Sequence, residues 1–206
     1  MQRKNKSLIA GLQVLTSLLA FAGVTIQVAL SKDSIYNMLS YFTIQSNLMV
    51  AIGLLLPLIA PETRAGKYFA KDSVTSALLL YILITGLIYN LLLRGSWHPK
   101  GADFIADNLV HVAVPLLFTV NWIFTTAPKS LKWKMLPSWT VYPLLYLAYT
   151  LVRGNIIKWY PYPFMKVTEL GYQRVLFNAA MMTLLFLLLS IAVVAFNRRR
   201  ENAKVS

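Results

Sequence analysis

The sequence predicts an all-α integral membrane protein with six transmembrane helices and both termini in the cytoplasm. Hydrophobic residues make up 57% of its 206 residues and its mean hydropathy is +0.58, values too high for a soluble domain whose surface must be polar. Charged residues contribute only 13% and fall mostly between apolar runs. Because no connecting segment is long enough to fold by itself, we expect a single membrane domain over residues 1–206.

Six apolar runs define the predicted spans, and most are long enough to cross ~30 Å of hydrocarbon at about 1.5 Å per residue. The first run continues to Leu30, longer than the apolar core of a signal peptide, so we expect it to remain as a span. The fifth run is short and contains Pro143, but Tyr142, Tyr146 and Tyr149 recur along it at helical spacing, so we include it. The predicted spans are residues 8–30, 36–60, 73–93, 105–126, 138–152 and 172–196.

Lysine and arginine residues are unevenly shared between the two sets of loops that six spans create. The loops on the side of the termini hold thirteen of the 20 Lys and Arg residues, and the other loops hold seven. Short loops rich in Lys and Arg stay in the cytoplasm, so we place both termini there. The compact, basic form without a soluble domain leads us to expect the plasma membrane of a bacterium. The richer set is Arg3, Lys4, Lys6, Arg64, Lys67, Lys71, Lys129, Lys132, Lys134, Arg198, Arg199, Arg200 and Lys204, and the poorer set is Lys32, Arg94, Lys100, Arg153, Lys158, Lys166 and Arg174.

The composition excludes several kinds of functional site. The lack of cysteine rules out disulfides, thiolate metal sites and a cysteine nucleophile. Two histidines, His98 and His111, are too few for a site built from several imidazoles, so we expect no metal and no cofactor. The net charge of +13 arises at helix ends and not on an exposed basic face, which argues against a nucleic-acid partner. No feature of the sequence specifies an oligomer.

Polar residues inside the predicted spans crowd toward the outer half of the bilayer. Thr43 lies seven residues into the second span and His111 six residues into the fourth, which places them ~10 and ~9 Å below the outer surface. Polar groups facing lipid tails cost several kcal/mol, so we expect these side chains to line an outward-facing polar pocket. The other candidates for this pocket are Gln45, Ser46, Asn47, Asp107 and Asn108, with Arg153 at the mouth of a span.

Helical spacing assigns these residues to faces. In the second span, one face carries four polar residues at i, i+3, i+6 and i+7, whereas Gln45 points elsewhere. In the fourth span, Asp107 and Asn108 share a face with His111, and Pro115 cannot donate to the His111 carbonyl, so the helix should bend there. The four residues in the second span are Ser40, Thr43, Ser46 and Asn47.

Three roles fit this arrangement. His111 could activate the Thr43 hydroxyl as a nucleophile, with Asp107 or Asn108 orienting the imidazole and Asn47 or Gln45 stabilising an oxyanion. Alternatively, the polar residues hold the helices together by hydrogen bonds, and the residue types alone favour this structural role. Asp107 and His111 would also suit a transporter or a proton relay.

Four motifs resemble the androgen-induced family of multi-span membrane proteins, including its bacterial members. The resemblance covers nearly the whole chain and implies a threonine hydrolase that cleaves fatty acid esters of hydroxy fatty acids inside the membrane. By motif position it assigns the catalytic roles to Thr43 and His111. The motifs are Tyr41-Phe42-Thr43-Ile44-Gln45-Ser46-Asn47-Leu48, Asn108-Leu109-Val110-His111, Tyr142-Pro143 with Arg153, and Trp159-Tyr160-Pro161-Tyr162-Pro163-Phe164.

The expected function is therefore an intramembrane lipid ester hydrolase with a Thr43–His111 dyad, acting on a fatty acyl ester within the bilayer. The alternative is a non-catalytic lipid-binding or transport protein that uses the same outer pocket. The loop between the fifth and sixth spans carries Asn155, Tyr160, Tyr162 and Glu169, which would form either a lid over the pocket or an aromatic belt among the lipid headgroups.

Overall fold

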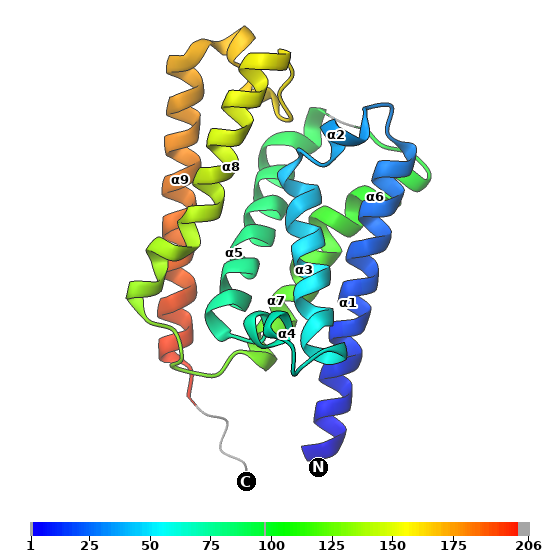
Figure 1. Ribbon diagram of the computed structural model, residues 1–206, viewed down its shortest axis with the longest axis vertical. Helices are drawn as coiled ribbons and strands as arrows, with labels where there is room; N and C mark the ends of the chain where they lie inside the picture. The colour runs from blue at the N-terminus through cyan, green and yellow to red at the C-terminus, as the bar shows by residue number, and fades with distance from the viewer. Residues whose placement is uncertain (1, 97, 202–206) are drawn as a thin grey trace. The chain divides into compact units, whose positions relative to one another are not determined.

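The computed structural model describes residues 2–96 and 98–201, and all regular structure within them is helical (Figure 1). The predicted all-α class is therefore confirmed for this part of the chain. Trp97 and Lys204 lie outside the described residues, as do the side chains of residues 2–5. Five helical segments are long and apolar enough to cross a membrane, namely Lys6–Leu30, Phe42–Ile59, Asp72–Ser96, Ala102–Thr125 and Val167–Arg199.

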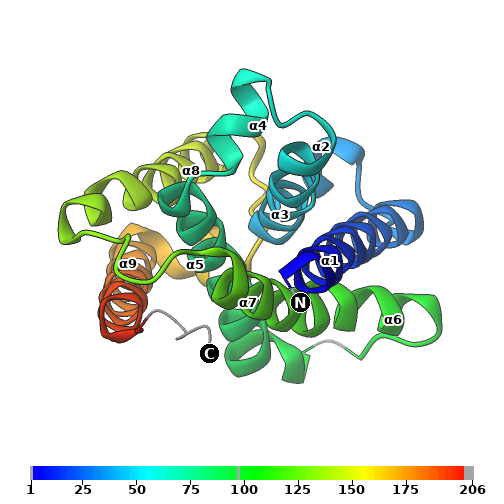
Figure 2. The ribbon, with the colours of Figure 1, turned by 90° about the horizontal axis from the view of Figure 1, so that it is seen from below.

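The chain divides into two compact units, residues 1–127 and 128–206. In the first unit, four helical rods form a closed ring in which α1 and α5 each contact both α3 and α7 (Figure 2). The first rod is α1, the second is α3, the third is α5 with η1, and the fourth is α6, η3 and α7. Short helices α2 and α4 and the turn η2 lie in the connections. The elements of this unit are α1 (Gln2–Leu30), α2 (Ile35–Met38), α3 (Phe42–Ile59), α4 (Arg64–Phe69), α5 (Asp72–Ile88), η1 (Tyr89–Leu93), η2 (Arg94–Ser96), α6 (Ala102–Asn108), η3 (Leu109–Ala113) and α7 (Val114–Thr125).

Buried hydrogen bonds join the rods of the first unit. The Ser17 hydroxyl of α1 donates to the Ala51 carbonyl of α3 over 2.8 Å, and the Trp122 indole of α7 donates to the Ser76 hydroxyl of α5 over 2.8 Å. Lipid tails are as apolar as leucine side chains, so helices in a bilayer associate through close packing and such polar contacts. The candidate site lies at another such contact, between α3 and η3.

The second predicted span is not one continuous helix. It is divided into α2 and α3 by residues 39–41, with Tyr41 in an extended conformation at φ −76° and ψ 131°. Side chains satisfy carbonyls around the break: the Ser40 hydroxyl donates to Tyr36 over 2.7 Å, and the Gln45 amide donates to Leu39 over 2.8 Å. The prediction that Ser40 shares a helical face with Thr43 was consequently wrong, because Ser40 precedes α3.

The third and fourth rods each contain a wider turn. α5 continues into the π-helical turn η1, and a second π-helical turn, η3, separates α6 from α7. The irregularity predicted near Pro115 thus takes the form of a π turn that ends two residues before the proline. This turn contains His111.

The second unit consists of two long helices that lie side by side, α8 (Leu136–Ile157) and α9 (Val167–Arg199), with short turns η4 (Trp133–Met135) and η5 (Pro163–Met165). α8 has 22 residues, so it is longer than the predicted span 138–152, but it is not one of the five strongly apolar helices. Helical geometry in α9 is interrupted at Gly171, where φ is 71°. In the connection between α8 and α9, Tyr160 is buried with its ring against Gly154 of α8.

Candidate active site

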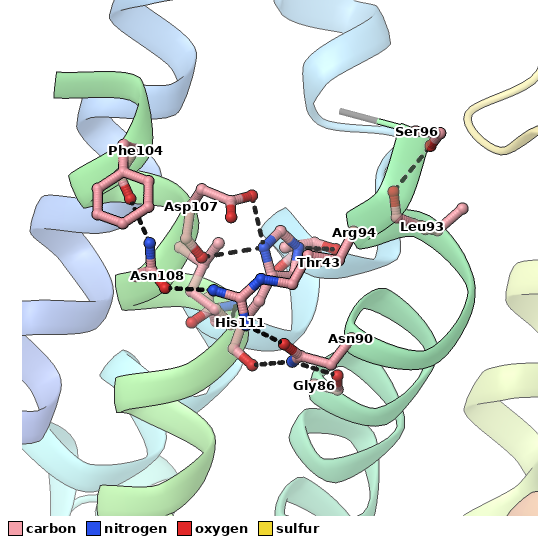
Figure 3. A network of polar contacts seen from close by, with 12 residues as sticks. Thr43, Gly86, Asn90, Leu93, Arg94, Ser96, Phe104, Asp107, Asn108 and His111 are labelled. Carbon is pink, nitrogen blue, oxygen red and sulfur yellow. Dashed lines mark hydrogen bonds and ion pairs between the residues drawn. The ribbon is translucent and has the colours of Figure 1, made fainter. Parts of the chain in front are cut away.

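Thr43 and His111 are in contact inside the first unit (Figure 3). The Thr43 Oγ1 atom lies 3.4 Å from the His111 Nε2 atom, although the two residues are 68 positions apart in the sequence. Both side chains are buried, with 8% and 7% of their surfaces exposed. The hydroxyl and the imidazole are therefore close enough to exchange a proton with a small adjustment.

Asp107 fixes the protonation pattern of this imidazole. Its Oδ1 atom lies 3.1 Å from His111 Nδ1, and its backbone oxygen lies 3.0 Å from the same nitrogen. A backbone oxygen can only accept a hydrogen bond, so a neutral imidazole in this geometry carries its hydrogen on Nδ1 and turns the lone pair of Nε2 toward Thr43. Asp107 is 4% exposed, and its i, i+4 spacing from His111 produces the contact.

The Tyr89 ring lies flat against the imidazole. The two ring centres are 3.6 Å apart and the planes differ by 6°, so Tyr89 holds the orientation of His111 from the side of η1. Tyr89 was not predicted from the sequence, because a single tyrosine in an apolar span is indistinguishable from a packing residue. The residue that follows it, Asn90, is a polar residue inside the third predicted span, and this neighbour is the signal by which the sequence could have marked Tyr89.

The neighbouring polar residues of α3 are bonded within the helix bundle. The Ser46 hydroxyl lies 2.8 Å from the Thr85 hydroxyl and donates to the Thr43 carbonyl over 3.2 Å. The Asn47 Nδ2 group donates to the carbonyls of Thr43 and Val110 over 2.9 and 3.2 Å. Asn47 and Gln45 thus direct amide N–H groups at backbone carbonyls.

A second group of residues surrounds the His111 backbone. The Asn90 Nδ2 group donates to the His111 carbonyl over 3.1 Å, and Arg94 donates to the Asn90 side-chain oxygen over 2.7 Å (Figure 3). Arg94 also donates to Asn108 Oδ1 over 2.9 Å, so Asn108 bonds to Arg94 and not to the imidazole. Arg153 belongs to the second unit, where its guanidinium lies 5.0 Å from the Trp159 ring.

Thr43 and His111 meet although they lie at different distances from the starts of their helical rods. α3 begins at Phe42 and α6 at Ala102, so Thr43 is near the start of its rod whereas His111 is well inside the other. α2 and residues 39–41 occupy the end of the bundle beyond α3 (Figure 1). The break consequently puts Thr43 in the first turn of a helix, the end that carries a partial positive charge.

Within the described ranges 2–96 and 98–201, no three His, Asp or Glu side chains gather as a metal ion would need. The chemical groups brought together are instead a hydroxyl, an imidazole and a carboxyl. In comparisons with protein-family models, curated proteins and solved structures, the chain matches none of them.

Proposed function

We propose that this chain is an intramembrane lipid ester hydrolase in which Thr43 is the nucleophile, His111 the general base and Asp107 the residue that orients His111. The observation that carries the proposal is the continuous set of contacts from Thr43 Oγ1 to His111 Nε2, at 3.4 Å, and from His111 Nδ1 to Asp107 Oδ1, at 3.1 Å. Nucleophile, base and orienting carboxyl in this order are the parts of the serine-hydrolase triad.

In the proposed reaction, Thr43 Oγ1 attacks the carbonyl carbon of an ester while His111 Nε2 takes the hydroxyl proton. The imidazolium returns this proton to the departing alcohol, which leaves an acyl-threonine. Water then attacks the acyl group with His111 again acting as base, and the products are a carboxylic acid and the free Thr43 hydroxyl. The 3.4 Å separation suits a resting site, since such contacts tighten when substrate binds.

The position of Thr43 in α3 supports the same chemistry. Negative charge develops on the ester oxygen during attack, and the first turn of a helix carries a partial positive charge. Thr43 is the second residue of α3, which is 18 residues long. The partial positive charge at the start of this helix would therefore stabilise the oxyanion.

The proposed substrate is a fatty acyl ester that reaches the site while its chains remain in the bilayer. Extracting an acyl chain into water costs ~0.8 kcal/mol per CH₂, so a site within the helical bundle spares that cost. Among such lipids, the family resemblance singles out fatty acid esters of hydroxy fatty acids. The site is compatible with any ester whose carbonyl can approach Thr43.

The test compares purified wild type with Thr43→Ala, Thr43→Ser and His111→Ala in lipid nanodiscs. We expect fluorophosphonate labelling and hydrolysis of a fluorogenic acyl ester in wild type and in Thr43→Ser, and neither in the two alanine variants. Thr119→Ala serves as the matched control, because the Thr119 hydroxyl donates only to Pro115 of its own helix over 2.7 Å. Equal turnover in all variants would end the proposal, and lipid binding or transport without turnover would favour the non-catalytic alternative.

We also propose that α8 is a sixth span and that both termini lie in the cytoplasm of a bacterial cell. The support is the length of α8, 22 residues or ~33 Å of helix, together with the thirteen-to-seven distribution of Lys and Arg. Because the chain has no cysteine, Lys129→Cys and Lys158→Cys can each be labelled without background. A membrane-impermeant maleimide applied to whole cells should label only Lys158→Cys, and identical labelling of both would exclude a spanning α8.

A further inference from the structure

We infer that Asn47 and Asn90 are positioning residues, which hold the π turn of His111 through the carbonyls of Val110 and His111, the two positions that could otherwise accept from the N–H that Pro115 lacks. The kinetic part of this inference rests on the proposed hydrolase function. The structural part concerns the orientation of His111 and stands independently of any reaction.

Pro115 deprives the turn around His111 of a backbone donor. In a π turn a carbonyl accepts from the N–H five residues later, and in an α turn from the N–H four residues later. Counted back from Pro115, these carbonyls belong to Val110 and His111, and proline has no N–H to offer either of them. Both residues are buried, so a donor from elsewhere in the bundle is needed wherever the helix supplies none.

Two asparagine amides from different rods supply those donors. Asn47 of α3 donates to Val110 over 3.2 Å, and Asn90 of η1 donates to His111 over 3.1 Å. Each Nδ2 group also donates to a carbonyl of its own rod, Asn47 to Thr43 over 2.9 Å and Asn90 to Gly86 over 2.8 Å. Each amide therefore ties two rods together at a fixed point.

Neither side-chain amide can exchange the positions of its oxygen and nitrogen without losing hydrogen bonds. An inverted Asn47 would place its oxygen against two carbonyl oxygens, and this residue has no exposed surface through which water could compensate. The Asn90 amide is fixed from its other end, because Arg94 donates to its oxygen over 2.7 Å. The Asn47 donor is thus held by the two carbonyls that its Nδ2 group contacts, and the Asn90 amide is held at both of its ends.

The rods must approach closely for these bonds to form. A Cβ atom at position 86 would lie 3.1 Å from the His111 oxygen and 3.3 Å from the Pro115 ring, which leaves room for glycine and little else. Gly86 therefore lets α5 come within reach of the turn. The close approach and the two amide bonds define one location for His111 between α3 and η1.

The Asn47 bond acts directly on the separation of the proposed catalytic atoms. It joins the carbonyl of Thr43 itself to the carbonyl of the residue before His111. Removal of this tie would let α3 and η3 shift, and the 3.4 Å contact between Thr43 and His111 would lengthen. Proton transfer to Nε2 would slow, whereas the approach of the substrate would change little.

The kinetic test measures kcat and KM separately for Asn47→Ala and Asn90→Ala, with Thr119→Ala as control. A displacement of about 1 Å at reacting atoms can cost about 10²-fold, so we expect kcat to fall roughly 10- to 100-fold while KM changes less than about twofold. If the wild type is active and kcat falls by less than about threefold in both variants, the inference is overturned.

A double variant separates positioning from simple stabilisation. Pro115→Ala restores a backbone N–H, so Asn47→Ala/Pro115→Ala should regain much of the thermal stability that Asn47→Ala loses. It cannot restore the link from α3 to η3, so kcat should remain low relative to Pro115→Ala alone. Full recovery of kcat together with stability would mean that Asn47 only satisfies a carbonyl, which contradicts the positioning role.

The structural test needs no activity. The chain has two histidines, so ¹⁵N-histidine NMR in nanodiscs yields two imidazoles, and His98→Gln identifies the signals of His111. Wild type should show one His111 species with a protonated Nδ1, and both asparagine variants should show shifted or multiple species. Unchanged His111 signals in both variants would overturn the inference. An inactive wild type would refute the proposed hydrolase function and leave the NMR result to decide the role of the asparagines.

Discussion

Replacement of Asp107 by asparagine exchanges the carboxyl that faces His111 for an amide of the same shape. A hydrogen bond to a charged group contributes about 1.5–3 kcal/mol, and each 1.36 kcal/mol corresponds to about tenfold in rate, so kcat should fall roughly 10- to 150-fold. The loss should stay within this range because the Asp107 backbone oxygen, 3.0 Å from Nδ1, still holds the hydrogen on that nitrogen. The imidazole would keep its tautomer and lose only the electrostatic stabilisation of its charged form.

The assay for Asp107→Asn is ester turnover in nanodiscs at saturating substrate, normalised to the amount of folded protein. Asp103→Asn is the matched control, because Asp103 lies one turn earlier in α6 and is partly exposed. We expect the control to retain wild-type kcat. A loss below threefold in Asp107→Asn, or the same loss in both variants, would refute the assignment of Asp107 as the orienting residue.

Three further substitutions probe other contacts. Tyr89→Leu should lower kcat about 2- to 13-fold, since an aromatic pair contributes about 0.5–1.5 kcal/mol beyond its buried area, whereas Tyr89→Phe keeps the ring and should lose less. Gly86→Ala should destabilise the bundle by about 1–3 kcal/mol through overpacking, and Gly11→Ala, where a Cβ meets nothing within 4 Å, should not lower the melting temperature. Asn197→Ala removes the side-chain acceptor of the buried Leu131 N–H, 3.0 Å away, and should lower the free energy of unfolding by about 1–3 kcal/mol, measured by thermal unfolding in detergent.

Hydropathy predicted the helical rods well because span length and apolar content are properties of the sequence itself. The first span ends at Leu30 as predicted, and the last resumes regular helix after Gly171. The break between α2 and α3 was not predictable in this way, because Leu39 and Tyr41 continue the apolar run through it. Side-chain bonds from Ser40 and Gln45 sustain the break, and their partners are known only from the structure.

The candidate site was predictable in its residue types and less so in its geometry. Thr43 and His111 were named from the sequence, and the contact between Asp107 and His111 follows from helical spacing. Tyr89 was missed because its stacking depends on how the third and fourth rods meet. Arg94 was counted only as a loop charge, since the amides that it contacts are four and fourteen positions away and neither marks it as a partner.

The flat contact between Tyr89 and His111 also bears on proton movement across the membrane. A histidine that conducts protons takes up a proton at one ring nitrogen and releases one from the other. The ring must then turn about its Cβ–Cγ bond before the next proton can follow. Here the turning ring would have to pass through a phenol ring only 3.6 Å away, and Nδ1 would have to leave Asp107. A turn of the His111 ring would therefore require Tyr89 and Asp107 to move first, so in the proposed hydrolase the stack that aligns the base would also oppose proton leakage at this position.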